Sequence, residues 1–148
     1  MTASIYMRPQ QEVSNTAATL VNGTTIFTVT GGPIEILALQ AVCVTGNNGT
    51  ASTLQWSHDP TDGAATTISA ASASLANAAA GASATFQGTA LSTAPTVTAN
   101  GACLGATRGV VVQAGTITTV VGVGSTTGTW KHYMAFRPLG PGITVTAP

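Results

Sequence analysis

The chain has 148 residues and a formal net charge of zero, with four Lys or Arg, four Asp or Glu and two His. Charged residues make up 5% of the sequence, whereas an ordinary soluble domain contains about 25%. Acid–base catalysis, metal binding and nucleic-acid binding all depend on ionisable side chains. The composition therefore argues against an enzyme, a metal or cofactor site and a nucleic-acid partner.

The beginning of the chain is predicted to differ from the rest. Residues 1–20 are expected to form an extended N-terminal arm, because Pro9 breaks regular structure and a polar run follows it. Residues 21–148 are expected to form a single β-sandwich domain. No apolar run follows a basic segment, and no apolar stretch approaches the roughly 20 residues of a membrane-spanning helix. We therefore expect synthesis in a cytosol and no membrane partner.

The first strands are predicted directly after the arm. Asn22-Gly23 is a turn dipeptide, and the run 24–30 that follows it alternates as a half-buried strand does. Residues 34–44 are apolar on both faces except at two positions, which is typical of a strand at the centre of a packed sheet. Residues 52–58 alternate again.

The middle of the chain, residues 64–107, is low in complexity and consists mostly of Ala, Ser, Thr and Gly. Residues 68–81 favour either a short helix or a long loop. Ile68 and Leu75 lie at helical spacing, and Gly81 would end a helix there. Short strands are predicted after this segment.

The last third is the most regular part. Three strands are predicted in residues 109–115, 116–124 and 127–139. The Gly-rich segment 122–128 is predicted to be a tight hairpin and not a phosphate-binding loop, because no helix follows it. The third strand alternates, with Trp130, His132, Met134 and Phe136 on one face and Lys131, Tyr133, Ala135 and Arg137 on the other. About eight to ten short strands in all predict an antiparallel sandwich or barrel.

Few residues are candidates for chemistry. His58, Asp59 and Asp62 lack the spacing of metal ligands and are interpreted as a loop beside Pro60. A Ser–His–acid site is not expected, because so few acids and His are present. Four Thr-x-Thr motifs have irregular spacing, so we interpret them as Thr on the solvent face of strands and not as an ice-binding array.

Other side chains are candidates for the core or for an interface. Cys43 and Cys103 are interpreted as buried free thiols, and Trp130 as a core residue. Arg has few possible partners in a chain with four acids, so ion pairing to another subunit is a natural use. The candidate interface residues are Ile5, Tyr6, Met7, Arg8, Pro9, Arg108 and Arg137.

The C-terminal pattern resembles a known family. Residues 109–115 form a Gly-Val strand that leads into an AGT turn, residues 122–128 read GVGSTTG, and residues 130–139 form an aromatic and basic strand that ends in RPL. Over roughly residues 64–142 this pattern resembles small virion proteins of tailed bacteriophages that are encoded close to the major capsid protein. The resemblance implies a capsid decoration, or cement, protein with a jelly-roll fold and no catalytic residues.

The hypothesis is therefore a non-enzymatic virion protein on the capsid exterior, assembled in the bacterial host cytoplasm. Its expected partners are the major capsid protein, whose subunits it would bridge to stabilise the shell, and itself, as a homodimer on a local two-fold or as a trimer. Residues 5–9 are expected to reach across a subunit boundary. Two alternatives stay open. One is a phage tail, fibre or head-fibre component. The other is a secreted β-sandwich for adhesion or sugar binding, which requires exposed aromatic residues along a groove.

Overall fold

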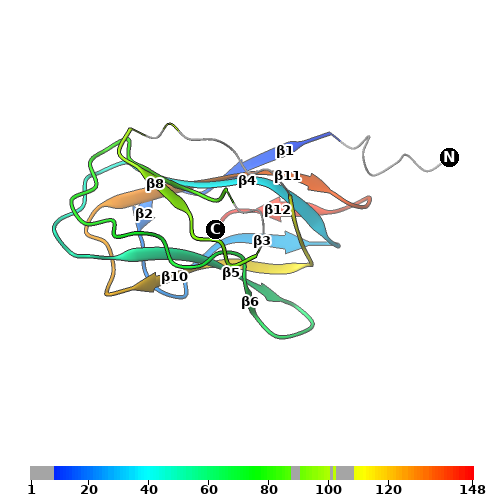
Figure 1. The fold of residues 1–148 in the computed structure, drawn as a ribbon. Coiled ribbons are helices and arrows are strands. Elements are labelled where there is room, and N and C mark those ends of the chain that lie inside the picture. Colours follow the sequence, from blue (N-terminus) through cyan, green and yellow to red (C-terminus); the bar gives the residue numbers. More distant parts are fainter. Residues whose placement is uncertain (1–8, 88–90, 101, 103–108) are drawn as a thin grey trace.

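The computed structural model describes residues 9–87, 91–100, 102 and 109–148. These residues form twelve β-strands and no helix. The strands make two antiparallel sheets that pack face to face as two layers (Figure 1). The predicted antiparallel β-sandwich is confirmed, with more strands than the eight to ten expected, because four-residue and shorter strands were not all recognised.

The larger sheet has seven strands. They are β1 (Gln11–Ser14), β2 (Ala18–Thr19), β4 (Ile34–Cys43), β7 (Ser83–Thr85), β8 (Thr96–Thr98), β9 (Val110–Val112) and β11 (Thr129–Pro138). The order is β1-β11-β4-β7-β8, with β2 also beside β11 and β9 also beside β4. The two longest strands, β4 and β11, therefore form its centre.

The smaller sheet has five strands. They are β3 (Thr25–Thr30), β5 (Thr53–Pro60), β6 (Thr66–Thr67), β10 (Gly115–Gly122) and β12 (Thr144–Thr146). The order is β12-β3-β10-β5-β6. The chain passes from one sheet to the other in both connections between β3 and β5. It does so again in all three connections between β9 and β12. Long-range pairing of this kind is typical of Greek-key sandwiches.

The segment 122–128 was wrongly predicted to be a hairpin, because β10 and β11 lie in different sheets. The segment crosses the gap of about 10 Å between the layers. Its Thr126 is buried, and Thr126 Oγ1 accepts a hydrogen bond from the Leu20 N–H at 2.8 Å. The Thr126 N–H donates in return to the Leu20 carbonyl at 3.1 Å. These bonds hold the segment across the end of the sandwich.

The core lies between the sheets and contains the residues that the alternating patterns predicted. All four inward residues of β11, including Trp130, are buried. The pairing of β4 with β11 skips one residue, Leu37, so that Ile36 and Leu39 both face inward. This bulge explains why β4 is apolar in both alternating phases. The predicted buried free thiol is confirmed for Cys43, whereas Cys103 lies outside the described residues.

Part of the predicted arm belongs to the sheet. Residues 11–14 pair with β11 opposite residues 133–136, and residues 18–19 pair with β11 nearer its start. Val13 packs against the core, and Leu20 is buried. The segment 9–20 therefore completes an edge of the larger sheet. Residues 1–8 lie outside the described part.

Residues 68–81 form an irregular connection, so the loop alternative is confirmed and the helix is not formed. Backbone N–H groups in this segment donate to carbonyl groups of β5 and of the residue just before it. In a helix they would donate to carbonyl groups of the preceding turn. Ser72 donates to the Leu54 carbonyl and Leu75 to the Ser52 carbonyl, both at 2.8 Å. Ile68 and Leu75 are buried.

Candidate functional site

The ionisable side chains of the described residues do not form a reactive cluster. No group of three or more His, Cys, Asp or Glu that could hold a metal ion occurs within these ranges. The described part of the chain contains no helix of the length and hydrophobicity needed to span a membrane. The buried ionisable groups of the described residues each have separate surroundings.

His58 lies in β5, so the alternating strand predicted over residues 52–58 is confirmed. The loop predicted beside Pro60 starts later than expected, because the strand includes Asp59 and Pro60. Its ring Nε2 lies 3.0 Å from the Gln113 carbonyl. Burial lowers the pKa of His58 from its usual 6.5, and the Gln113 carbonyl and Asp59 partly oppose this shift. A neutral imidazole that donates to a backbone carbonyl fulfils a structural role.

His132 is fully enclosed between the sheets. Its backbone N–H donates to Asn15 Oδ1 at 2.7 Å, and Asn15 Nδ2 lies 3.3 Å from His132 Nδ1. Because the amide nitrogen can only donate, Nδ1 accepts and Nε2 carries the ring proton. Burial lowers the pKa of His132 to about 4, so the ring is neutral near pH 7. Its ring stands edge-on to Trp56 at a centroid distance of 6.3 Å.

Cys43 is also held as a neutral group. Its thiol donates to the Thr45 carbonyl at 3.2 Å. Burial raises the pKa of Cys43, and the hydrogen bond to the Asn47 backbone opposes this only in part. The thiolate, which is the nucleophilic form, is thus disfavoured.

The outer surface of the seven-stranded sheet carries most of the charged side chains in the described part of the chain, and we call it the charged face. Arg8 and Arg108 lie outside the described residues, which leaves six of the eight charged side chains. Four of these six project from this one surface: Glu12, Glu35, Lys131 and Arg137. The other two, Asp59 and Asp62, lie at the end of β5.

A hollow of about 400 Å³ lies on the charged face. It is lined by Glu12, Val13, Ser14, Ala38, Gln40, Tyr133, Met134 and Ala135. Two rows of paired residues build it. Glu12, Ala135 and Ala38 stand opposite one another on β1, β11 and β4, and Ser14, Tyr133 and Gln40 form the next row. The small Ala side chains leave the space, and Tyr133 stands beside it.

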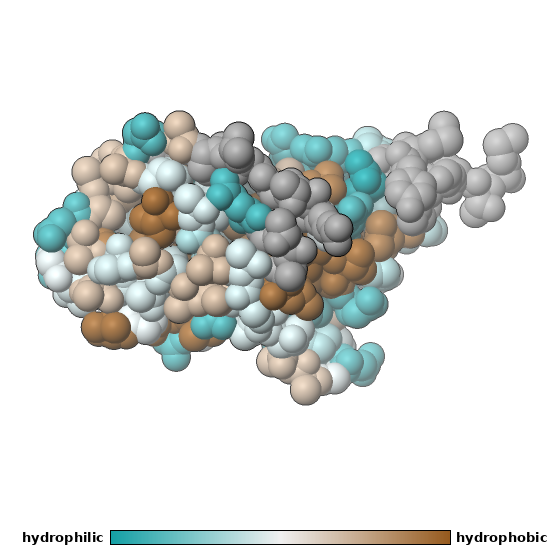
Figure 2. All heavy atoms as spheres, viewed as in Figure 1, coloured by the Kyte–Doolittle hydropathy of each residue, from teal (hydrophilic) through white to brown (hydrophobic). Residues whose placement is uncertain are grey.

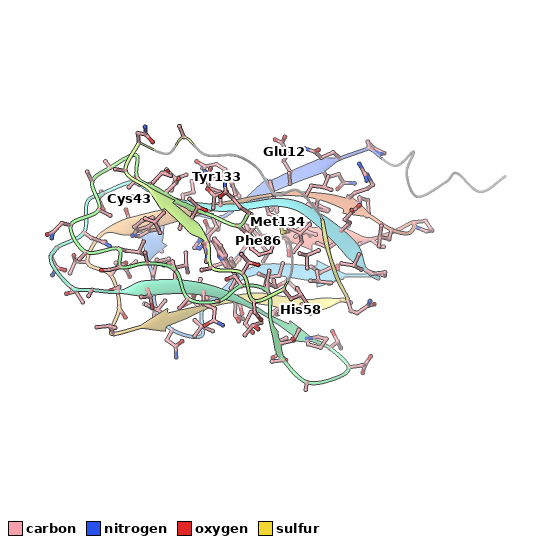
Figure 3. All side chains as sticks on the ribbon, viewed as in Figure 1. Glu12, Cys43, His58, Phe86, Tyr133 and Met134 are labelled. Atoms are coloured by element: carbon pink, nitrogen blue, oxygen red, sulfur yellow. The ribbon has the colours of Figure 1, made fainter. Side chains whose placement is uncertain are left out.

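Tyr133 is the exposed aromatic residue of this hollow, with 43% of its surface accessible. Figure 3 shows Tyr133 and Glu12 on the same side of the sandwich, while Met134 and Phe86 point between the sheets. Lys131 Nζ lies 5.2 Å from the centroid of the Tyr133 ring. Gln40 Nε2 donates to Thr85 Oγ1 at 2.8 Å, which fixes the amide. The hollow therefore has one aromatic wall and positioned polar groups.

Arg137 has a partner within its own chain. It stands directly opposite Glu35 in the β11–β4 pairing, and the guanidinium lies 3.1 Å from the carboxylate. Arg137 thus pairs with one of the few acids of its own chain, whereas the sequence had suggested ion pairing to another subunit. Cross-strand pairing supplied the acid, although the two residues are far apart in sequence. Its use in an interface remains a prediction.

The outer surface of the five-stranded sheet is chemically different, and we call it the hydroxyl face. Three of the four Thr-x-Thr motifs lie on its adjacent strands β12, β3 and β10. Thr146, Thr28 and Thr116 stand opposite one another in one row. In a neighbouring row Thr30 Oγ1 lies 2.7 Å from Thr144 Oγ1. Strand pairing thus brings Thr residues with irregular sequence spacing into rows, and the spacing alone did not predict these rows.

A second hollow, of about 240 Å³, lies beside β9 and is lined partly by Leu91, Val110 and Val111. In Figure 2 a group of hydrophobic residues lies beside the grey atoms, further hydrophobic residues stand apart from it, and much of the visible described surface is pale. Val111 and Leu91 are each more than half exposed. This area forms a small apolar patch at the edge of the sandwich.

The predicted interface residues are mostly outside the described part of the chain. These are Ile5, Tyr6, Met7, Arg8 and Arg108. Pro9 is described and exposed, and Arg137 is half-buried beside Glu35. The residues of the charged-face hollow were not predicted, although the alternation in β11 had already placed Tyr133 on the outer side.

Comparisons with known protein families, with curated proteins and with solved structures each found no match.

Proposed function

We propose that this chain is a non-enzymatic capsid decoration protein that binds the outside of a phage head and bridges subunits of the major capsid protein. The hydroxyl face is the observation that carries the proposal. Its rows of Thr side chains stand on paired strands and not on loops. A paired sheet holds its side chains at fixed spacing, which suits repeated docking onto a regular lattice.

The hydroxyl face is the proposed docking surface. Burying a charge without a partner costs far more free energy than burying a hydroxyl group that finds a hydrogen bond. The rows of Thr on the hydroxyl face offer neutral donors and acceptors, and one carboxylate, Asp59, stands at the end of a row beside Thr116. The charged face would instead expose both Glu12 and Lys131 to desolvation. Because many copies act on one shell, each contact can be weak.

The proposal includes the jelly-roll connectivity that the sequence resemblance implies. The repeated crossing of the chain between the two sheets supports it.

The proposal also includes self-association, as a homodimer on a local two-fold or as a trimer. Pro9 is exposed where the chain enters β1 at the sheet edge, which supports a role for residues 5–9 in contacting a neighbour.

The direct test is reconstitution on heads that lack the protein. Purified protein is mixed with such heads, and occupancy is measured by electron cryomicroscopy and by the temperature at which the heads open. Thr144→Lys and Thr146→Lys place a positive charge at exposed positions of the hydroxyl face and are expected to abolish binding. Ser14→Lys changes an equally small hydroxyl residue on the opposite face and is expected to bind like the wild type. Deleting residues 1–9 is expected to lower occupancy.

The same images distinguish the alternatives. Density across the whole shell supports decoration, and density at one vertex supports the tail or fibre alternative. Absence of binding to any part of the particle contradicts both. The sugar-binding alternative gains one observation, because Tyr133 is exposed in a hollow.

A further inference from the structure

We propose that the hollow on the charged face binds a neutral saccharide, with Tyr133 as the stacking residue and Glu12 and Gln40 as hydrogen-bonding groups. This site lies on the sheet opposite the proposed docking surface. A decorated head would therefore present it to the surroundings. The binding itself does not depend on the capsid role.

The floor of the hollow suits the flat face of a sugar ring. Ala38 and Ala135 stand opposite each other at the centre of the sheet. Their methyl groups are apolar and short, so they leave room above the sheet and offer a dry contact for C–H groups. The volume of about 400 Å³ falls within the range of small-molecule sites, which is about 300 to 1,000 Å³.

Tyr133 supplies the wall. Residues 131, 133 and 135 project from the same side of β11, because side chains alternate along a strand. Lys131 lies over the ring, and Lys131 does not line the hollow. Tyr133 therefore borders the hollow together with Ala135, and Lys131 stands outside it. Aromatic faces pack against the weakly positive C–H groups of pyranose rings, and the phenol hydroxyl adds a polar end.

The polar groups around this wall match the hydroxyl groups of a sugar. Glu12 is exposed and its carboxylate accepts hydrogen bonds, and Ser14 can donate or accept. Gln40 is held by Thr85 through its amide nitrogen, so its Oε1 is positioned as an acceptor. Neighbouring hydroxyl groups of a pyranose can donate to such acceptors together.

The charges favour a neutral ligand over an anionic one. Among the described residues that line the hollow, Glu12 is the charged one, and it would repel a carboxylate or a sulfate. The two cations of this face are already engaged, since Lys131 lies over Tyr133 and Arg137 pairs with Glu35. A neutral hexose or N-acetylhexosamine unit meets none of this repulsion.

The test is a methyl NMR titration of the free protein with ¹³C-labelled Ala. The probes are maltose, cellobiose and chitobiose, each added up to saturation or to its solubility limit. At least one disaccharide is expected to shift the Ala38 and Ala135 methyl signals in a saturable way. Tyr133→Phe keeps the ring and is expected to retain binding, whereas Tyr133→Ala is expected to weaken it by about tenfold or more.

Val120→Ala is the matched control, because Val120 is an exposed strand residue on the hydroxyl face. It is expected to leave binding unchanged. Co-sedimentation with starch, cellulose and chitin shows whether the ligand is a surface polysaccharide or only a free oligosaccharide. If no disaccharide shifts these methyl signals and no polymer retains the protein, the proposal is wrong. It is also wrong if Tyr133→Ala binds like the wild type. Neither result bears on capsid binding.

Discussion

The Asn15 side chain holds His132 through two hydrogen bonds, one that its Oδ1 accepts from the backbone N–H and one between its Nδ2 and the ring Nδ1. A third hydrogen bond joins the backbones, from the Asn15 N–H to the His132 carbonyl at 3.2 Å. The two residues are 117 positions apart in the sequence. Asn15 follows β1 at the edge of the larger sheet, and His132 lies in the neighbouring strand β11 with its ring in the core. A polar edge residue therefore fixes the orientation of a buried, neutral imidazole, and this has consequences for stability.

The first prediction concerns pH. Burial lowers the folded-state pKa of His132 to about 4, while the unfolded value is about 6.5. Between these values the unfolded chain binds the proton and the folded protein does not, so the free energy of unfolding falls as the pH is lowered from 6.5 to 4. The expected loss is about 3 kcal/mol. Urea unfolding at pH 7.5, 6.0, 5.0 and 4.0 measures it.

His132→Phe removes the titrating group and is expected to flatten this pH dependence, whatever its effect on stability at pH 7.5. Burial also lowers the pKa of His58, so part of the slope belongs to that residue. His58→Gln in both backgrounds separates the two contributions. An unchanged slope in His132→Phe would contradict the assignment.

The second prediction concerns Asn15→Ala. This change leaves the His132 backbone N–H and ring Nδ1 without their partner. An unsatisfied buried polar group costs about 1 to 3 kcal/mol, and we expect a loss of that size in urea unfolding. Asn48 offers a matched control, because its side chain accepts from the Thr50 N–H at an exposed site. If Asn48→Ala is as destabilising as Asn15→Ala, burial of the His132 contacts is not the cause.

The third prediction concerns Gly128, where the chain enters β11. A Cβ atom there would lie 2.2 Å from the Thr45 carbonyl oxygen, which is part of the backbone and cannot easily move. Gly128→Ala should therefore cost about 3 kcal/mol, seen as a lower melting temperature. At Gly49 an added Cβ would meet only the Asn77 side chain at 3.8 Å. Gly49→Ala is expected to leave the melting temperature nearly unchanged, and equal effects would argue against the close approach.

The fourth prediction concerns the ion pair of Glu35 and Arg137. Both side chains are about a quarter exposed, so solvent weakens their attraction. A double-mutant cycle with Glu35→Gln and Arg137→Gln should give a coupling free energy of about 1 kcal/mol or less, which decreases at high salt. A coupling free energy several times larger would mean that the pair is shielded from water, for example by a neighbouring subunit.

The sequence predicted those parts of the fold that depend on local alternation. The faces of β11 and the burial of Trp130 follow directly from side chains that alternate along one strand. Pairing between distant strands has no such local signal. The segment 122–128 therefore looked like a hairpin, because glycines allow a tight turn but do not say which sheet the next strand joins.

The candidate sites were not predicted for the same reason, because they depend on pairing between strands that are distant in the sequence. The rows of the hydroxyl face exist only because β12, β3 and β10 are adjacent and in register. The hollow beside Tyr133 exists only because Ala38 and Ala135 meet across two strands. The sequence gives the types of these residues, but it does not show which residues stand opposite them on adjacent strands.

The reciprocal bonds between Leu20 and Thr126 bear on how the molecule opens. Both residues lie in connections between strands, where backbone amides usually exchange with solvent within seconds to minutes. Here each amide is hydrogen-bonded and each residue is buried. Their deuterium uptake should be as slow as that of the central strands, so at this end of the sandwich the two layers can separate only by global unfolding.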